Sequence, residues 1–156
     1  MKRIAVLSRG AAGKSTLAVQ LAGLLDVPLI ELDALFWQPG PTPTPPEAWQ
    51  RTHQRLIAHE HWIIDGDLGD HDRQLALRLA RADTIIILDF PLRICVPRAL
   101  YRSRETWDFW RWLVRYRRDS LPRITAAAHR NTRARTYTLR TPSEVDALLA
   151  DLRKGP

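Results

Sequence analysis

The sequence predicts an α/β protein with three layers, in which helices cover both faces of a parallel β-sheet. Short apolar runs rich in β-forming residues alternate with segments of helical periodicity along the chain. Each segment between successive strands is long enough for a right-handed crossover, which parallel pairing requires. A glycine-bearing loop also joins the first apolar run to the first helical segment. Together these observations favour a three-layer fold built from βαβ units.

Composition is that of an ordinary globular protein, and we expect a single domain over residues 1–156. Hydrophobic residues make up 45% of the chain and charged residues 26%. The longest apolar run, TIIILDF, contains Asp89 and is too short to cross a bilayer, and the start of the chain lacks the order of a signal peptide. We therefore expect a cytoplasmic protein with no membrane partner. The single cysteine, Cys95, excludes an intrachain disulfide and a cysteine metal cluster.

The elements follow from periodicity and from breaker residues. We expect strands at 3–7, 28–32, 83–90 and 136–139, and one more strand that ends at residue 65. We expect helices at 14–25, from about 46, near 73–81, over most of 91–121 and from about 143. Pro97 is expected to bend the long helical segment, which should end before Pro122, and the proline-rich stretch after Asp33 is expected to be an extended loop.

The loop LSRGAAGKSTLA, residues 7–18, nearly matches a phosphate-binding loop. The pattern asks for Gly, four residues and then Gly-Lys-Ser/Thr; Gly13, Lys14 and Ser15 match it, while Ser8 stands in place of the first glycine. Backbone N–H groups of such a loop wrap a phosphate, the lysine reaches the β- and γ-phosphates, and the hydroxyl holds Mg²⁺. The residues expected to make these contacts are Gly10, Ala11, Ala12, Gly13, Lys14, Ser15 and Thr16. The alternative is a plain strand-to-helix turn with an incidental lysine.

Aspartates stand where three of the expected strands end. Asp33, Asp65 and Asp89 each close a strand, and they lie at the same edge of a parallel sheet as the loop. Ligands of open α/β sheets bind outside this edge. These acids are therefore candidate site residues.

Arginine is concentrated between residues 93 and 140. This stretch holds thirteen arginines, no lysine and three acids, in a chain of net charge +7. Nucleotide phosphates and nucleic acid both suit this chemistry, and a plain solvated surface is the alternative. A polar stripe at helical spacing consists of Arg104, Asp108, Arg111, Arg115 and Arg118. Beside it Trp107, Trp110 and Val114 form an apolar strip that favours packing over base stacking.

Several motifs in order resemble the topology-modulation proteins, an adenylate-kinase-like branch of P-loop proteins. They are GKSTLA, ELDALFW, WIIDGD, ADTIIILDFP, FWRWLVRYRR and LRTPSEVDALL, and they span nearly the whole chain. The resemblance implies a P-loop NTPase fold with five parallel strands in the order 2-3-1-4-5. It also implies an acceptor-binding segment at about 33–60, a short helical lid at about 98–121, and ATP and Mg²⁺ as cofactors. The chain departs from the family at Ser8, Ala11 and Ala12, where the family is richer in glycine, and in DGDLGDHDRQ, where relatives carry an asparagine.

The resemblance also implies roles for individual residues. Asp65 would anchor Mg²⁺ through its water, and a turn acid is the alternative; Asp33 would bind the acceptor hydroxyl and take its proton, and a helix N-cap is the alternative. Arg98 and Arg102 would clamp the base and phosphates of the nucleotide.

The remaining expectations concern the lid and the reaction. Arg115 and Arg118 would stabilise charge on the transferring phosphoryl group. The function expected is transfer of the ATP γ-phosphate to a nucleotide or another small molecule. A nucleotide-dependent regulator that binds nucleic acid is the second hypothesis, and a plain ATPase is the third.

Overall fold

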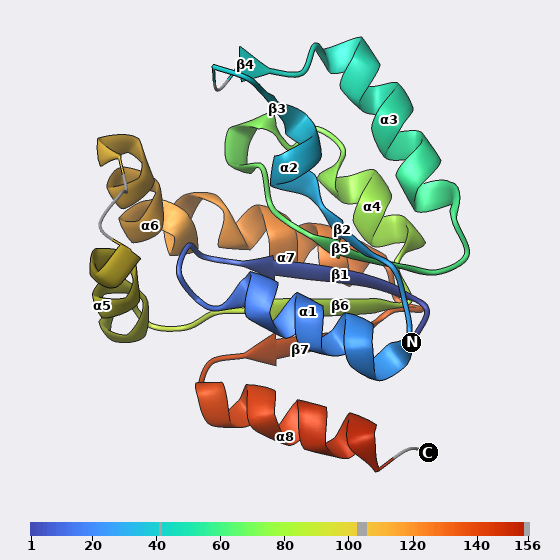
Figure 1. Cartoon of the computed structure of the whole chain (residues 1–156), viewed down its shortest axis with the longest axis vertical. Helices are drawn as coiled ribbons and strands as arrows, with labels where there is room; N and C mark the ends of the chain where they lie inside the picture. The colour runs from blue at the N-terminus through green and yellow to red at the C-terminus, as the bar shows by residue number, and fades with distance from the viewer. Residues whose placement is uncertain (41, 103–105, 155–156) are drawn as a thin grey trace.

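The structure is a computed structural model, in which residues 1–40, 42–102 and 106–154 are described, except for the side chain of Arg102. Strands and helices alternate along the chain (Figure 1). The strands are β1 (Arg3–Ser8), β2 (Leu29–Glu31), β3 (Trp37–Gln38), β4 (Thr42–Pro43), β5 (Trp62–Asp65), β6 (Thr84–Leu88) and β7 (Arg135–Leu139). The helices are α1 (Lys14–Leu25), α2 (Leu32–Phe36), α3 (Pro46–Ala58), the short 3₁₀ helix η1 (Gly69–His71), α4 (Leu75–Arg81), α5 (Leu92–Arg102), α6 (Trp107–Asp119), α7 (Leu121–Arg130) and α8 (Pro142–Arg153).

The main sheet has five parallel strands in the order β2-β5-β1-β6-β7. Counted in chain order within this sheet, the order is 2-3-1-4-5, so the prediction is confirmed. β1 lies in the middle of the sheet, paired with β5 on one side and β6 on the other. The loop that follows β1 therefore leaves the centre of the sheet at its carboxyl edge.

Alternate residues of each central strand serve two cores, one on each face of the sheet. Ile4 and Val6 pack with α1 and α8, whereas Ala5 and Leu7 pack with α4 and α7. Figure 1 shows these layers, with α1 and α8 on one side of the sheet. Strands that are apolar on both faces form this arrangement because helices cover each side. The three-layer prediction is confirmed.

Four predicted elements differ in detail from the structure. The long helical segment is three helices, α5, α6 and α7, and Pro122 lies in the first turn of α7, where a missing N–H is tolerated. Asp33 does not end a strand but lies in the first turn of α2. The proline-rich stretch contains a small antiparallel hairpin of β3 and β4. Helix α8 is capped by Thr141 rather than Ser143, because Pro142 occupies its first turn and the Thr141 hydroxyl accepts from the Glu144 N–H at 3.3 Å.

The predicted apolar strip on α6 is wrong for two of its three residues. Trp107 is 80% exposed and Val114 is 60% exposed. The buried face of α6 is instead formed by Leu113 and Tyr116. Helix α6 packs on the loop that follows β1, at the carboxyl edge of the sheet. Contact with this loop, and not apolarity alone, therefore decides which face of α6 is buried.

A buried ionic network holds the segment after β5 in place. The Arg78 guanidinium in α4 donates to both carboxylate oxygens of Asp72, at 2.5 and 3.2 Å, and to the Gly66 carbonyl at 3.3 Å. It also contacts the Nε2 of His53, in α3, at 3.2 Å. Arg78 and His53 are fully buried. The network ties α3, α4 and the loop after β5 together.

We expect the stability of the protein to fall as the pH drops below 6.5. Burial, reinforced by Arg78, lowers the pKa of His53 from 6.5 to about 4. Between these values the unfolded chain binds a proton that the folded chain does not, so the free energy of unfolding decreases, by about 3 kcal/mol once the pH has passed 4. Chemical denaturation from pH 7 to pH 4 measures this loss. His53→Gln should show a shallower fall over the same interval, and an equal slope would contradict the assignment.

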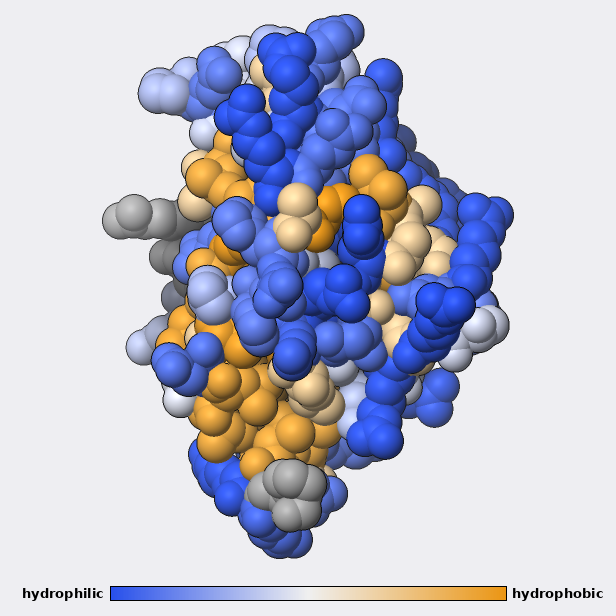
Figure 2. All heavy atoms as spheres, turned by 90° about the vertical axis from the view of Figure 1, so that its right-hand side faces the viewer, coloured by the Kyte–Doolittle hydropathy of each residue, from blue (hydrophilic) through white to orange (hydrophobic). Residues whose placement is uncertain are grey.

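Figure 2 shows the end of the molecule at which the parallel strands begin. Hydrophilic side chains cover much of this face, with apolar side chains gathered in its lower part. None of the described helices is both long and apolar enough to cross a membrane. The loop after β1 lies at the opposite end, where the strands finish (Figure 1).

Candidate functional site

The loop between β1 and α1 has the backbone shape of an anion cradle. Ser8 is buried at the end of β1 and its hydroxyl donates to the Arg9 carbonyl at 2.8 Å. Its φ is not positive, so this position does not require the glycine that the loop pattern has there. The left-handed positions are Ala11 (φ 57°) and Gly13 (φ 93°), which alternate with Ala12 and Lys14. Such alternation points successive N–H groups into one concavity, in line with the N-terminus of α1.

Lys14 forms an ion pair with Asp65 across the mouth of the loop. The Lys14 ammonium donates to the Asp65 carboxylate, which is 2% exposed at the end of β5. Ser15 and Thr16 follow in the first turn of α1 and are exposed. The structure therefore brings together Lys14, Ser15 and Asp65, three of the residues that the sequence singles out.

Two cavities meet at this loop. One has a volume of about 600 Å³ and the other of about 750 Å³. Ala11, Ala12, Gly13 and Thr16 line both of them. The loop is thus the partition between two spaces, each large enough for a small molecule.

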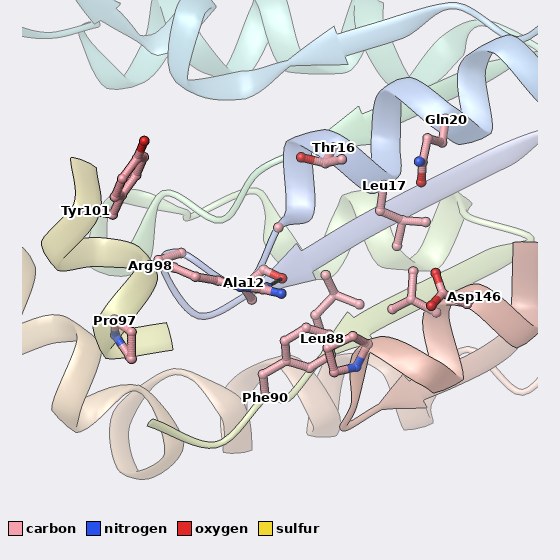
Figure 3. A pocket seen from close by; sticks show the side chains of 14 residues that line it. Ala12, Thr16, Leu17, Gln20, Leu88, Phe90, Pro97, Arg98, Tyr101 and Asp146 are labelled. Carbon is pink, nitrogen blue, oxygen red and sulfur yellow. Dashed lines mark hydrogen bonds between the residues drawn. The ribbon is translucent and has the colours of Figure 1, made fainter. Parts of the chain in front are cut away.

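The first cavity is largely apolar and has one arginine at its edge (Figure 3). Arg98 extends from α5 toward the loop and donates to the Ala12 carbonyl at 3.1 Å, with its guanidinium 5.9 Å from the centre of the Phe90 ring. Leu88, Pro97 and Val145 contribute apolar surface. The side chain of Arg102, the second predicted clamp residue, lies outside the described residues.

The second cavity holds Lys14 and Asp33 together. Asp33 projects from α2, and its carboxylate accepts a long hydrogen bond, 3.4 Å, from the indole N–H of Trp37. Although Asp33 is exposed, the protein atoms around its carboxylate displace water and raise the pKa of the Asp33 carboxyl, and Lys14 opposes this shift. A helix N-cap is not its role, because Glu31 is the N-cap residue of α2.

Arg9 is a site residue that the sequence analysis did not find. It lines the second cavity although it is only 2% exposed. Its guanidinium lies 5.6 Å from the centre of the Tyr116 ring, and its Nε has no hydrogen-bond partner among the described residues. Burial lowers the pKa of Arg9. A buried cation beside an anion cradle adds to the positive potential there.

Helix α6 packs directly on the loop. A Cβ at Gly10 would lie 2.6 Å from the ring of Phe109 and 2.8 Å from that of Trp112. Arg117 fastens the same helix to the edge of the sheet, because its Nε and Nη2 donate to the Asp89 carboxylate at 2.8 and 3.2 Å. Asp89 therefore holds the helix, and the absence of a side chain at Gly10 allows it to approach.

We expect Gly10→Ala to displace α6 from the loop. The added methyl group overlaps two aromatic rings, and an overpacked contact of this kind costs roughly 1–3 kcal/mol. Chemical denaturation measures the loss of stability, and the fluorescence of the α6 tryptophans reports the displacement. Phe109→Ala should restore much of the stability in the double variant. Simple additivity of the two losses would show that Gly10 does not meet Phe109.

Two of the predicted lid arginines lie away from the cavities. Arg115 and Arg118 are exposed on the outer face of α6, and Arg118 donates to Asp119 at 2.7 Å. The part they would play in transfer stays a prediction. Arg104 of the polar stripe lies outside the described residues, and Asp108 faces the second cavity.

The sequence HEH at residues 59–61 is a solvated helix end. His59 follows α3, and His59, Glu60 and His61 are exposed. Over residues 1–40, 42–102 and 106–154, no group of three or more His, Cys, Asp or Glu side chains is placed to hold a metal ion.

Comparison with known proteins identifies the class to which the fold belongs. No family model matches the sequence, and neither does any curated protein. The structure is similar to that of shikimate kinase from Acinetobacter baumannii in complex with shikimate, with a TM-score of 0.67 and 16% identity, over 97% of this chain and 90% of that one. It is also similar to a gluconokinase from Sinorhizobium meliloti 1021, with a TM-score of 0.56 and 18% identity, over 98% and 94% of the two chains. Shikimate kinase from Aquifex aeolicus vf5 gives a TM-score of 0.55 and 21% identity, over 97% and 96%. The chain therefore has the fold of P-loop kinases.

The structure adds residues to the predicted site from four places: the phosphate loop, β3, the segment after β5, and α6. They are Arg9, Trp37, Asp67, Asp70 and Trp112. Asp67 and Asp70 follow β5 closely, so the rule that ligands bind beyond strand ends could have found them. Arg9 has no signal in the sequence, because its role depends on where α6 packs.

Proposed function

We propose that the protein transfers the γ-phosphate of ATP to a hydroxyl group of a small molecule. The observation that carries this proposal is the position of the loop, which lines both cavities at once. Phosphates bound in the loop would lie between a base in the first cavity and an acceptor in the second. That is the arrangement that direct transfer between two bound substrates requires.

The roles of the residues follow from their places. The N–H groups of Gly10–Ser15 and the Lys14 ammonium bind the phosphates, and Arg98 holds the nucleotide against the apolar wall of the first cavity. Bound phosphate competes with Asp65 for Lys14. Asp33 accepts the proton of the acceptor hydroxyl.

In the transfer step one bond to phosphorus forms, one breaks, and one proton moves. The acceptor oxygen forms a bond to the γ-phosphorus, and the bond from that phosphorus to the oxygen bridging to the β-phosphate breaks. ADP leaves, and the acceptor proton passes to Asp33. Lys14 and the loop N–H groups stabilise the charge that develops on the phosphoryl oxygens.

The oxygen donors beside Lys14 fit Mg²⁺, which would neutralise charge on the β- and γ-phosphates when bound. Ser15 lines the second cavity and supplies a hydroxyl, and Asp65 supplies a carboxylate at the loop. Asp65 would act through a water molecule. The sequence motifs further favour membership of the topology-modulation proteins, with one domain over residues 1–156, an acceptor segment at 33–60 and a lid at 98–121.

The experiment is a transfer screen with ATP and Mg²⁺ over nucleoside monophosphates, sugars and hydroxy acids, including shikimate and gluconate. ADP release and phosphorylated product are measured together. Product formed in proportion to ADP supports the proposal. ADP release that no acceptor stimulates indicates an ATPase, and the absence of ATP binding overturns the proposal.

A regulator that binds nucleic acid is the second candidate, and the outward direction of the α6 arginines favours it. Arg111, Arg115 and Arg118 are all exposed. If these side chains only form a diffuse field, Arg118→Ala should weaken DNA binding modestly and reduce the slope against log salt by about one. If the lid closes over the phosphates, the same variant should lower kcat by about 10²-fold or more, with little change in ATP affinity. Turnover and salt dependence measured on one preparation separate the two candidates.

A further inference from the structure

The second cavity has two chemically different sides. Its cations, Arg9 and Lys14, both belong to the phosphate loop. The remaining lining residues form what we call the acceptor wall, which faces the loop. The acceptor wall consists of Asp33, Trp37, Asp67, Leu68, Gly69, Asp70, His71, Asp108, Phe109 and Trp112.

The acceptor wall carries four aspartates and, among its described residues, neither lysine nor arginine. This is unusual in a chain with 24 Lys and Arg against 17 Asp and Glu. An acceptor that bears a carboxylate or a phosphate needs guanidinium or ammonium donors on the wall that holds it. Here the charged groups that such an acceptor would meet on the wall are the four carboxylates.

One of these carboxylates lacks a partner where it is buried. The Oδ1 of Asp67 accepts from the Gly69 N–H at 2.9 Å, but its buried Oδ2 has no hydrogen-bond partner among the described residues. Burial raises the pKa of the Asp67 carboxyl, which shows that the local environment disfavours the charge. A cation bound in the cavity that Asp67 lines would offset part of that penalty through its charge.

The aromatic side chains of the wall point to the same ligand chemistry. Trp37, Phe109 and Trp112 line the cavity together with the aspartates. Ring faces attract ammonium groups, and carboxylates supplement this attraction. A metal site built from these aspartates alone does not explain them, because within the described residues no three His, Cys, Asp or Glu side chains are placed to hold one metal ion. Asp70 is partly balanced by Arg123, at 3.1 Å on the surface, whereas Asp33, Asp67 and Asp108 have no such ion pair within the described residues.

We infer that the acceptor is a cationic amino alcohol, with an ammonium group on the acceptor wall and a hydroxyl group toward the loop. This inference rests on the proposed function, because the ligand of the second cavity is an acceptor only if the protein transfers a phosphoryl group. The cavity itself is charged so that its two ends attract opposite groups, phosphate at the loop and amine at the wall. An acceptor of this class would be held with its hydroxyl between Asp33 and the γ-phosphate.

The test compares probes that share a carbon frame and differ in charge. Glucosamine, glucose and gluconate form one set, and ethanolamine, ethylene glycol and glycolate form the other. Binding to the whole protein is measured by calorimetry with and without ATP and Mg²⁺. We expect the amine of each set to bind roughly 10- to 100-fold more tightly than its neutral partner, and the acid to bind most weakly. Equal or stronger binding of the neutral or acidic member in both sets overturns the inference.

A matched pair of variants assigns the effect to the wall. Asp67→Asn keeps the acceptor for the Gly69 N–H and removes one negative charge, so it should reduce the preference for amines about tenfold. Asp151→Asn removes the same charge from the exposed surface of α8, where Asp151 pairs with Lys154, and should leave the preference unchanged. Equal losses in both variants would show a general effect of net charge and would overturn the inference.

The proposed function and this inference fail in different ways. The order of affinities for the amine, neutral and acidic probes, measured without nucleotide, does not depend on phosphoryl transfer. If the ranking persists while ATP fails to bind, the proposed function is wrong and the cavity still selects amines. If ATP-dependent product forms from anionic acceptors alone, the proposed function stands and the inference is wrong.

Discussion

Replacing Lys14 with methionine is expected to reduce ATP-dependent transfer by at least about 10³-fold. Lys14 is the only ammonium group that the described structure places at the phosphate loop, and it would stabilise the transferring phosphoryl group. Methionine retains most of the length of the side chain without its charge. Initial rates with ATP and Mg²⁺, together with ATP affinity from calorimetry, measure the effect.

The same substitution should also destabilise the fold. Asp65 is 2% exposed and pairs with Lys14, so Lys14→Met leaves a buried carboxylate without its partner. Breaking such a pair costs about 3 kcal/mol, near the lower limit for buried pairs because Lys14 itself is partly open to solvent. Lys14→Met/Asp65→Asn should therefore recover stability while activity stays lost. Unchanged ATP affinity and turnover in the single variant would refute the assignment of the loop.

This pairing shows what the sequence could and could not predict about Lys14. The spacing of Gly13, Lys14 and Ser15 after an apolar strand is a local pattern, and it predicts the loop correctly. From the sequence alone Lys14 would contact only phosphate. Its partner Asp65 is 51 residues away, and parallel pairing of β1 with β5 brings the two together.

The sheet was predictable because its central strands are apolar on both faces. Runs such as TIIILDF can only lie between two layers of helices, and the right-handed crossover rule limits the remaining topologies. The buried face of helix α6 was harder to predict. Its exposed Trp107 and buried Tyr116 reverse what hydrophobicity suggests, because the loop and Arg9 shape its inner face.

The acceptor wall could be predicted only in part. Asp33 was found because it follows an apolar run, although the structure places it in the first turn of α2 rather than at a strand end. Asp67 and Trp37 belong to different segments, and the network of Arg78, Asp72 and His53, whose members are far apart in the sequence, helps to fix the loop that carries Asp67. Cavities built from separate segments leave no local pattern in a sequence.

The second large effect is expected at Asp33. Asp33→Asn should lower the rate of transfer by about 10²- to 10⁴-fold, the range for loss of a general base, and leave ATP affinity close to that of the unaltered protein. Desolvation by neighbouring protein atoms raises the pKa of the exposed Asp33 carboxyl, the direction that suits a base. Asparagine retains an oxygen for the Trp37 N–H, so the geometry of α2 should persist.

The pH dependence of the reaction separates a base from a merely structural acid. If Asp33 takes the acceptor proton, the rate should fall as the pH drops through its raised pKa, and Asp33→Asn should remove this limb of the profile. Asp26→Asn, at the far end of α1 from Lys14, removes an equal charge and should keep the limb. A loss of ATP affinity in step with transfer in Asp33→Asn would instead make Asp33 a support for the loop. The proton would then have to pass to another carboxylate of the acceptor wall. Asp67 would be the first to replace, because its pKa is also raised and its Oδ2 has no hydrogen-bond partner in the part of the chain that the structure describes.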